Sequence, residues 1–297
     1  MACTTTTTNI NMEAATVSWG KEGRFCIEPV DGLGGGEHFT YATQTEKYYV
    51  WFNLDGNSAD PAPAGYVGQE ASIVTGHTVS DVVAAIKSAV EASNEAIVEV
   101  SADGNSCVIE TLDIGACLES VAVATSGFTV SDLEIGVGGN LGKTKSAIEL
   151  SMEVSTSEVK SNQTGETLID KIITGTKASI KADLLEMTPE KWELIVGKGY
   201  GDIKEVGTDK LVGMGTSRIN QSAFNTSGKL VLHPVRLPET DRSKDIVFFK
   251  ATPLPESVNY DGTDTQAMSV GFEAFVDDTK DSKINVWAMG DWRKDLR

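Results

Sequence analysis

The sequence holds only three histidines, the side chains best suited to proton transfer near neutral pH: His38, His77 and His233. None has a second histidine, cysteine or carboxylate nearby at the spacing of a metal site or a catalytic pair. No nucleophile elbow, HExxH or Ser/His/Asp pattern is present. We therefore interpret the histidines as structural or surface residues, and predict no catalytic residue, no cofactor and no metal.

The segment Gly136–Thr144, GVGGNLGKT, comes close to a phosphate-binding loop. That motif needs a glycine five residues before the glycine of Gly-Lys-Thr, and this position holds Val137. A strand pattern, and no helix pattern, follows the segment, so its amides cannot form a cradle at a helix N-terminus. We interpret the segment as a hinge between domains.

Oxygen-bearing side chains gather at Asp55-Gly56-Asn57 and Asp60, but the glycine and the closing glutamate of a calcium-binding hand are missing. An Asp-Gly pair instead predicts a hairpin turn.

The four cysteines contain no CxxC pair, which indicates free thiols in a reducing compartment, with a Cys107–Cys117 bridge left open. They are Cys3, Cys26, Cys107 and Cys117.

The elements that would position these residues are mainly strands, because short apolar runs alternate with Gly, Asp and Asn turns. The clearest strands are Ser146–Ser155 and Met268–Val276, where apolar and polar side chains alternate with a period of two. Two helices are expected, one capped by Thr78 and ending near Ala92, the other beginning at Thr188-Pro189-Glu190 and ending at Gly197. Further strands are expected at 16–19, 24–28, 47–54, 96–101, 107–112, 176–185, 229–235, 246–251 and 284–289.

Charge divides the chain unevenly. The net charge is −18, and between Glu37 and Phe128 thirteen acidic residues face two basic ones. Glycine-rich stretches, 32–36 and 136–139, flank this acidic segment. We therefore predict an inserted α+β domain at 37–128, within a β domain formed by 1–36 and 129–297.

The acidity of the chain argues against ordinary nucleic-acid binding, which needs a basic surface. No apolar run is long enough for a transmembrane helix, so no membrane partner is expected.

Three stretches of the C-terminal half resemble bacteriophage tail tube (major tail) proteins. They are the long alternating strand Ile148–Val154 with the polar excursion Ser155–Glu166 after it, the strand Ile173–Leu185 followed by a short helix, and the strands within Lys229–Ala251 and Met268–Asp277. Residues 1–35 are similar to the family's opening strands. The segment 37–128 departs from the minimal fold and looks like the extra domains that some tail proteins carry outside the tube.

The resemblance implies a mainly β fold, a sandwich or barrel with one packed short helix, that assembles into stacked hexameric rings. These rings would form the virion tube through which genomic DNA passes without specific binding. Assembly would take place in the host bacterial cytoplasm. The main partner would be the chain itself; tail sheath, tape measure, baseplate and neck proteins are further partners that the resemblance allows. It does not distinguish a contractile from a non-contractile tail.

Two sets of residues are candidates for roles in such a tube. The polar excursion would stack onto the next ring, whereas an ordinary long hairpin loop is the alternative. Its candidate residues are Ser155, Glu158, Lys160, Asn162, Gln163 and Glu166. On the polar face of the preceding strand, Glu149 and Glu153 are candidates for the wall of the lumen, where carboxylates would repel phosphate.

Three other functions remain open at this point. The chain could be another virion component, such as a decoration or connector protein. It could be a carbohydrate-binding adhesion module, with Tyr48, Tyr49 and Trp51 as a sugar platform, although aromatic residues in strands more often pack in a core. An enzyme with an unrecognised site is the third, because carboxylates are plentiful.

Overall fold

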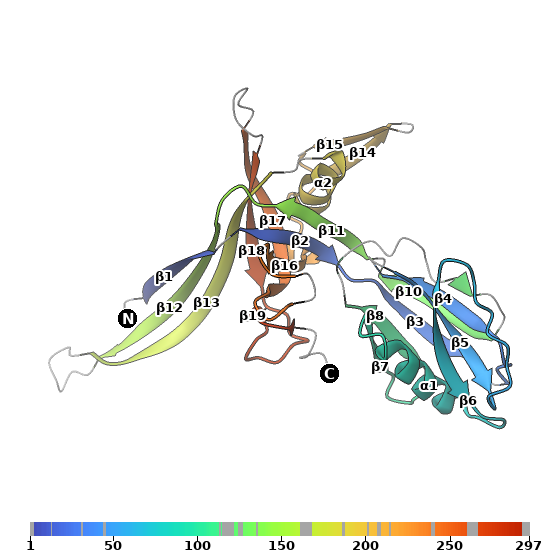
Figure 1. The fold of residues 1–297 in the computed structure, drawn as a ribbon. Coiled ribbons are helices and arrows are strands. Elements are labelled where there is room, and N and C mark those ends of the chain that lie inside the picture. Colours follow the sequence, from blue (N-terminus) through green and yellow to red (C-terminus); the bar gives the residue numbers. More distant parts are fainter. Residues whose placement is uncertain are drawn as a thin grey trace. The chain divides into compact units, whose positions relative to one another are not determined.

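The protein is mainly β, as the sequence predicts, and its described part divides into two compact units (Figure 1). The first comprises Met1–Ser18 and Asn140–Trp292, and the second comprises Trp19–Gly139. The computed structural model describes residues 3–12, 14–30, 32–43, 46–112, 114, 122–123, 127–134, 136–160, 168–185, 188–200, 202–206, 209–213, 215–238, 241–259 and 267–292.

The first unit is built on a nine-stranded sheet in which the strands follow the order β1-β12-β13-β18-β17-β16-β2-β11, with β19 paired to β17. A separate hairpin pairs β14 with β15. The chain passes from this unit into the second within β2 and returns within β11. The strands are β1 (Cys3–Met12), β2 (Ala15–Lys21), β11 (Val137–Lys143), β12 (Ile148–Lys160), β13 (Leu168–Leu184), β14 (Asp202–Val206), β15 (Asp209–Gly213), β16 (Gly228–Pro234), β17 (Ile246–Asn259), β18 (Ala267–Phe275) and β19 (Trp287–Met289).

Alternation along these strands buries one face of the sheet. On β13, Ile180, Ala182 and Leu184 are buried, whereas Lys181 between them is exposed. The pattern holds on β12, where Ile148 and Leu150 are buried. One sheet face of the first unit therefore forms a core, and the other carries polar side chains.

The predicted second helix begins where the sequence indicates but does not end there. Thr188 caps α2 (Pro189–Trp192) by accepting a hydrogen bond from the Lys191 amide. The helix then continues as a π-helix, Glu193–Tyr200, past Gly197, and a 3-10 turn follows at Ala223–Thr226. The π-helix packs against β17 with Ile195 and Val196 buried, and this packing outweighs the glycine stop signal.

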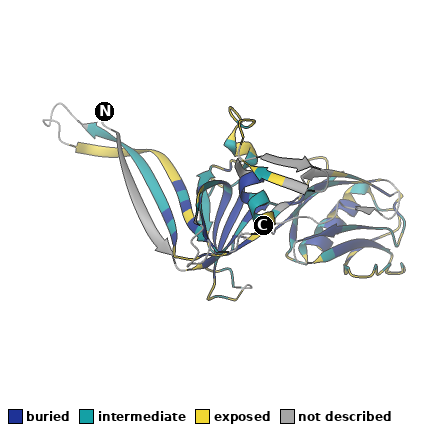
Figure 2. Ribbon diagram, turned by 90° about the horizontal axis from the view of Figure 1, so that it is seen from above, coloured by how far each residue is buried: buried dark blue, intermediate teal, exposed yellow. Residues whose placement is uncertain are grey.

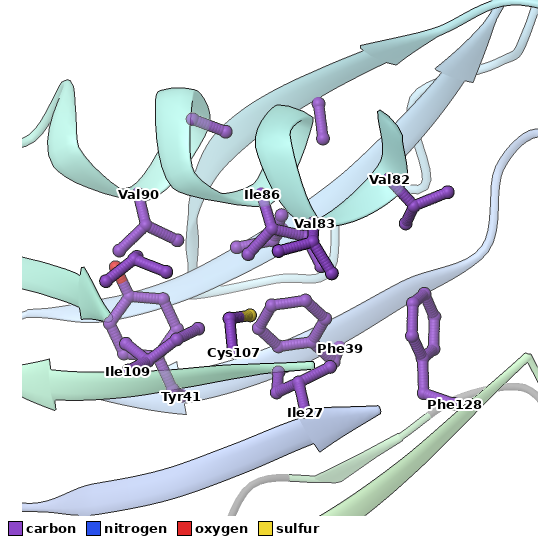
Figure 3. Packing of buried hydrophobic residues seen from close by; sticks show 14 of the residues in the cluster. Ile27, Phe39, Tyr41, Val82, Val83, Ile86, Val90, Cys107, Ile109 and Phe128 are labelled. Carbon is purple, nitrogen blue, oxygen red and sulfur yellow. The ribbon is translucent and has the colours of Figure 1, made fainter. Parts of the chain in front are cut away.

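The second unit combines two four-stranded sheets with one helix. One sheet has the order β10-β3-β8-β7 and the other β6-β5-β4-β9. Both sheets and α1 contribute to a single core (Figure 3). Phe128 packs there against Phe39 and Phe52. The elements are β3 (Arg24–Pro29), β4 (His38–Ala42), β5 (Lys47–Leu54), β6 (Val67–Ile73), α1 (Val79–Glu91), β7 (Ala96–Val100), β8 (Cys107–Thr111), β9 (Ala122–Val123) and β10 (Phe128–Glu134).

This unit is larger than the predicted insertion at 37–128. β3 precedes that segment and β10 follows it, yet both pair within the unit. Their side chains Phe25, Ile27 and Phe128 are buried in its core. The charge shift marks only where the acidic stretch begins and ends, whereas strand pairing sets the boundary of the unit.

Candidate functional site

The polar face of the first unit carries a ladder of opposite charges. The two predicted lumen residues lie on it: Glu149 is directly opposite Lys181, and Glu153 is opposite Lys177. The strand beyond β13 adds Glu273, and β17 adds Glu256. This arrangement follows from the period of two, because each of these strands turns its polar residues to the same side.

Two ion pairs cross this face. Lys177 Nζ lies 2.8 Å from Glu273 Oε1, and Lys181 pairs with Glu256. The hydrogen bond and the charge of Glu273, together with the charge of Glu153, raise the pKa of Lys177. Glu256 does the same for the pKa of Lys181, with smaller contributions from Asp183 and Glu149. Because both pairs are exposed, they order the surface more than they stabilise the fold.

A shallow groove of about 290 Å³ runs between these charged residues. Ile180, Leu254 and Phe272 also line it. Gly271 keeps the groove open beside Glu256, whose carboxylate would lie 3.3 Å from a Cβ at that position. Around the groove, the described charged side chains of this face include Glu149, Glu153, Asp183, Glu256 and Glu273 together with Lys177 and Lys181.

Five carboxylates and two ammonium groups give these seven side chains a net charge of −3. The lysines are engaged by Glu273 and Glu256 and so offer no cluster of positive charge to a phosphate. Chemically, the face suits passage or exclusion of a polyanion better than its binding.

The predicted stacking loop is shorter than the sequence indicates. Ser155 and Glu158 lie within β12, which continues to Lys160, so the prediction that the polar excursion begins at Ser155 is wrong. Pairing with β13 as far as Lys160, and with β1 as far as Ser157, holds the segment extended. Lys160 pairs with Leu168 at the end of the ladder. Asn162, Gln163 and Glu166 lie outside the described residues.

Strands β1, β12 and β13 form a ribbon that extends beyond the rest of the first unit (Figure 1). We call the part formed by Cys3–Met12, Val154–Lys160 and Leu168–Lys177 the arm. Every residue from Leu168 to Lys177 is exposed, as the yellow stretch of β13 shows (Figure 2). Four of them are large and apolar, and Ile172 and Ile173 are 54% and 66% exposed although neighbouring residues face opposite sides of a strand. Exposed isoleucines therefore lie on both faces of β13 within the arm.

His233 and Asp245 form a hydrogen-bonded pair that their spacing in the sequence does not predict. His233 Nδ1 lies 2.7 Å from Asp245 Oδ1, and His233 Nε2 lies 3.3 Å from the Leu237 carbonyl oxygen. Asp245 is fully buried, and burial raises the pKa of its carboxyl despite the opposing effect of His233. Both ring nitrogens face oxygen atoms, so the pair ties the end of β16 to the start of β17. No sequence signal links two residues twelve positions apart in this way.

Other sequence candidates have structural roles. Asp55-Gly56 forms a turn with positive φ at both residues, but it leads to β6, which is parallel to β5, so the predicted hairpin is wrong. Asp55 accepts hydrogen bonds from Thr75. Gly136–Thr144, interpreted as a hinge between domains, forms β11 and contains the boundary between the two units at Gly139 and Asn140.

The sugar platform left open as an alternative is contradicted, because its three aromatic residues are buried, as expected for aromatic residues in strands. Tyr48, Tyr49 and Trp51 are 7%, 4% and 7% exposed. Tyr48 stacks on Tyr41 in the core of the second unit, and the Tyr49 hydroxyl donates to Asp60. Burial of these three residues removes the observation on which an adhesion module rested.

Across the described ranges, no three His, Cys, Asp or Glu side chains gather as they would around a metal ion. Nor does this part of the chain contain a helix with the length and apolarity needed to cross a membrane. Comparison with protein-family models and with curated proteins found no match for the chain.

Proposed function

We propose that this chain is a structural, self-assembling protein, and specifically a subunit of a bacteriophage tail tube. The arm is the observation that carries the proposal. Its exposed isoleucines on both faces cost free energy in water, and a neighbouring subunit would cover them.

The charged sheet face supports a conduit for DNA. In a tube, Glu149 and Glu153 would belong to the wall of the lumen, among seven charged side chains of this face whose net charge is −3. Phosphate would be repelled at short range and so would slide past. The second unit has its own core, so it can decorate the exterior without taking part in the wall.

Electron microscopy and light scattering of the purified chain test the proposal. We expect rings, or stacked rings with an open centre, for the unaltered protein. Ile173→Lys should reduce assembly at least tenfold at equal concentration, because a charge would replace an apolar contact at each interface.

Ile219→Lys is the matched control, because Ile219 is 65% exposed in the same unit but lies outside the arm. This variant should assemble like the unaltered chain. Circular dichroism should show that both variants keep the native fold. Monomers at every salt and protein concentration, without substitution, would refute the proposed function.

A further inference from the structure

The arm has two unpaired strand edges. β12 is its central strand, paired with β1 on one side and with β13 on the other. β1 ends the described sheet order, so no described strand covers its outer edge. β18 pairs with β13 only from Ser179 to Leu184, which leaves the outer edge of Leu168–Ala178 without a described strand. Unpaired edges of this length readily accept another strand.

The two edges belong to strands that run in the same direction. β1 is antiparallel to β12, and β12 is antiparallel to β13, so β1 is parallel to β13. Within one copy they cannot meet, because two strand spacings separate them by about 10 Å. The two edges of one copy therefore cannot pair with each other.

Charge favours a second copy of this chain as that partner. The whole chain carries −18, and two copies repel one another over most of their surface. The arm is different: β1, CTTTTTNINM, has no charged residue, and Leu168–Lys177 has one acid and two lysines, a net of +1. Two copies can therefore approach through their arms with little repulsion.

We infer that the outer edge of Leu168–Lys177 in one copy pairs, in parallel, with the outer edge of β1 in a neighbouring copy. The inference rests on the proposed function and specifies the joint between adjacent subunits. Each copy offers one edge of each kind, so the contact is head-to-tail and can repeat until a ring closes. The parallel direction follows from the odd number of strands in the arm.

A two-fold contact would have a different geometry. β13 against β13 of a second copy would be antiparallel, would use the same edge twice and would leave both β1 edges open. Growth would then stop at a dimer. The two arrangements can be separated by asking which strands become linked in the assembled protein.

Cysteine cross-linking between differently labelled copies tests the inference. Cys3 is already present on β1, and Ile172→Cys or Ile173→Cys adds a thiol to β13 on one face or the other. A mixture of ¹⁴N and ¹⁵N copies is assembled and treated with a short bis-maleimide. Mass spectrometry then counts only the cross-links that join a light peptide to a heavy one.

We expect mixed links from residue 3 to residue 172 or 173, and their loss when Cys3→Ser is added. Ile219→Cys, matched in exposure, should give no such link to Cys3. Assemblies that yield only β13-to-β13 links, or none involving Cys3, would overturn this joint and leave the proposed function intact. A chain that forms no assembly under any condition would overturn both.

Discussion

Cys26 and Cys107 differ in burial, and this difference determines how readily their thiols react. Cys107 is 1% exposed in the core of the second unit, and burial, with a small contribution from Cys26, raises the pKa of its thiol to about 12. Cys26, on the neighbouring strand, is only partly buried, and burial and Glu28 also raise its pKa. Spacing along the sequence gives no indication of this difference in exposure.

We therefore expect Cys107 to resist thiol reagents in the folded protein. At pH 8 a thiol of pKa about 12 is ionised to roughly one part in ten thousand, and the core also excludes the reagent. In a Cys3→Ser, Cys117→Ser background, one thiol should react readily and the other only after denaturant is added. Peptide mapping should assign the fast thiol to Cys26; equal rates would contradict the packing of β8.

Asp277 makes the free energy of unfolding depend on pH. Burial alone would raise the pKa of Asp277, but hydrogen bonds from Thr279 and the ammonium of Lys250, 3.4 Å away, outweigh it and hold the pKa below its usual value of 3.8. A lowered pKa contributes stability above the unfolded value and loses it as pH falls through the folded value.

The free energy of unfolding should consequently fall as the pH drops below 3.8, and part of this fall should be absent in Asp277→Asn. Denaturant titrations at a series of pH values measure it. Asp278→Asn, altered at the adjacent exposed residue, is the control and should keep the full pH dependence. Identical profiles for the unaltered chain and Asp277→Asn would refute this role of the carboxylate.

At the scale of elements, the start of a helix depends on residues that are neighbours in the sequence, whereas the extent of a strand depends on the strands that pair with it. The structure confirms the predicted start of α1: Thr78 accepts a hydrogen bond from the Asp81 amide, and the Asp81 carboxylate accepts one from the Thr78 amide. The extent of β12 is decided by its neighbours. Ser155–Lys160 has a polar composition typical of a loop, yet pairing with β13 along its length, and with β1 as far as Ser157, holds it extended.

The capping box of α1 can be tested by Thr78→Ala. Both reciprocal hydrogen bonds are lost or weakened, so the free energy of unfolding should fall by about 1 kcal/mol. Ser88→Ala, at an exposed position inside the same helix, should leave it unchanged or slightly higher, because alanine favours helix. Equal effects of the two substitutions in urea titrations would show that the cap does not stabilise α1.

At the scale of the whole molecule, the division into units follows strand pairing. All the residues of the second core lie between Phe25 and Phe128, and the sheet β10-β3-β8-β7 closes it. We expect a fragment spanning Trp19–Gly139 to fold alone, with a cooperative thermal transition. A fragment spanning 37–128 lacks Phe25 and Ile27 and nearly all of β10, so it should fail to give one. Cooperative unfolding of the shorter fragment would show that the boundary lies where the charge shift places it.

The sequence alone determined the mainly β class, the alternation that separates polar from apolar faces, the caps of both helices and the acidity of the second unit. These properties depend on residues a few positions apart, or on composition, so they can be predicted without a fold. The strands expected from the pattern did not include β1, although a run of β-branched threonines favours a strand; only the family resemblance placed opening strands within 1–35.

Only the tertiary structure decided the boundary of the second unit, the length of the arm and the ion pairs across the sheet. Lys181 and Glu256 are 75 positions apart, and the His233–Asp245 pair forms only when β16 and β17 align. The register of distant strands brings such residues together, and it depends on the packing of the entire sheet. No short stretch of sequence contains that information.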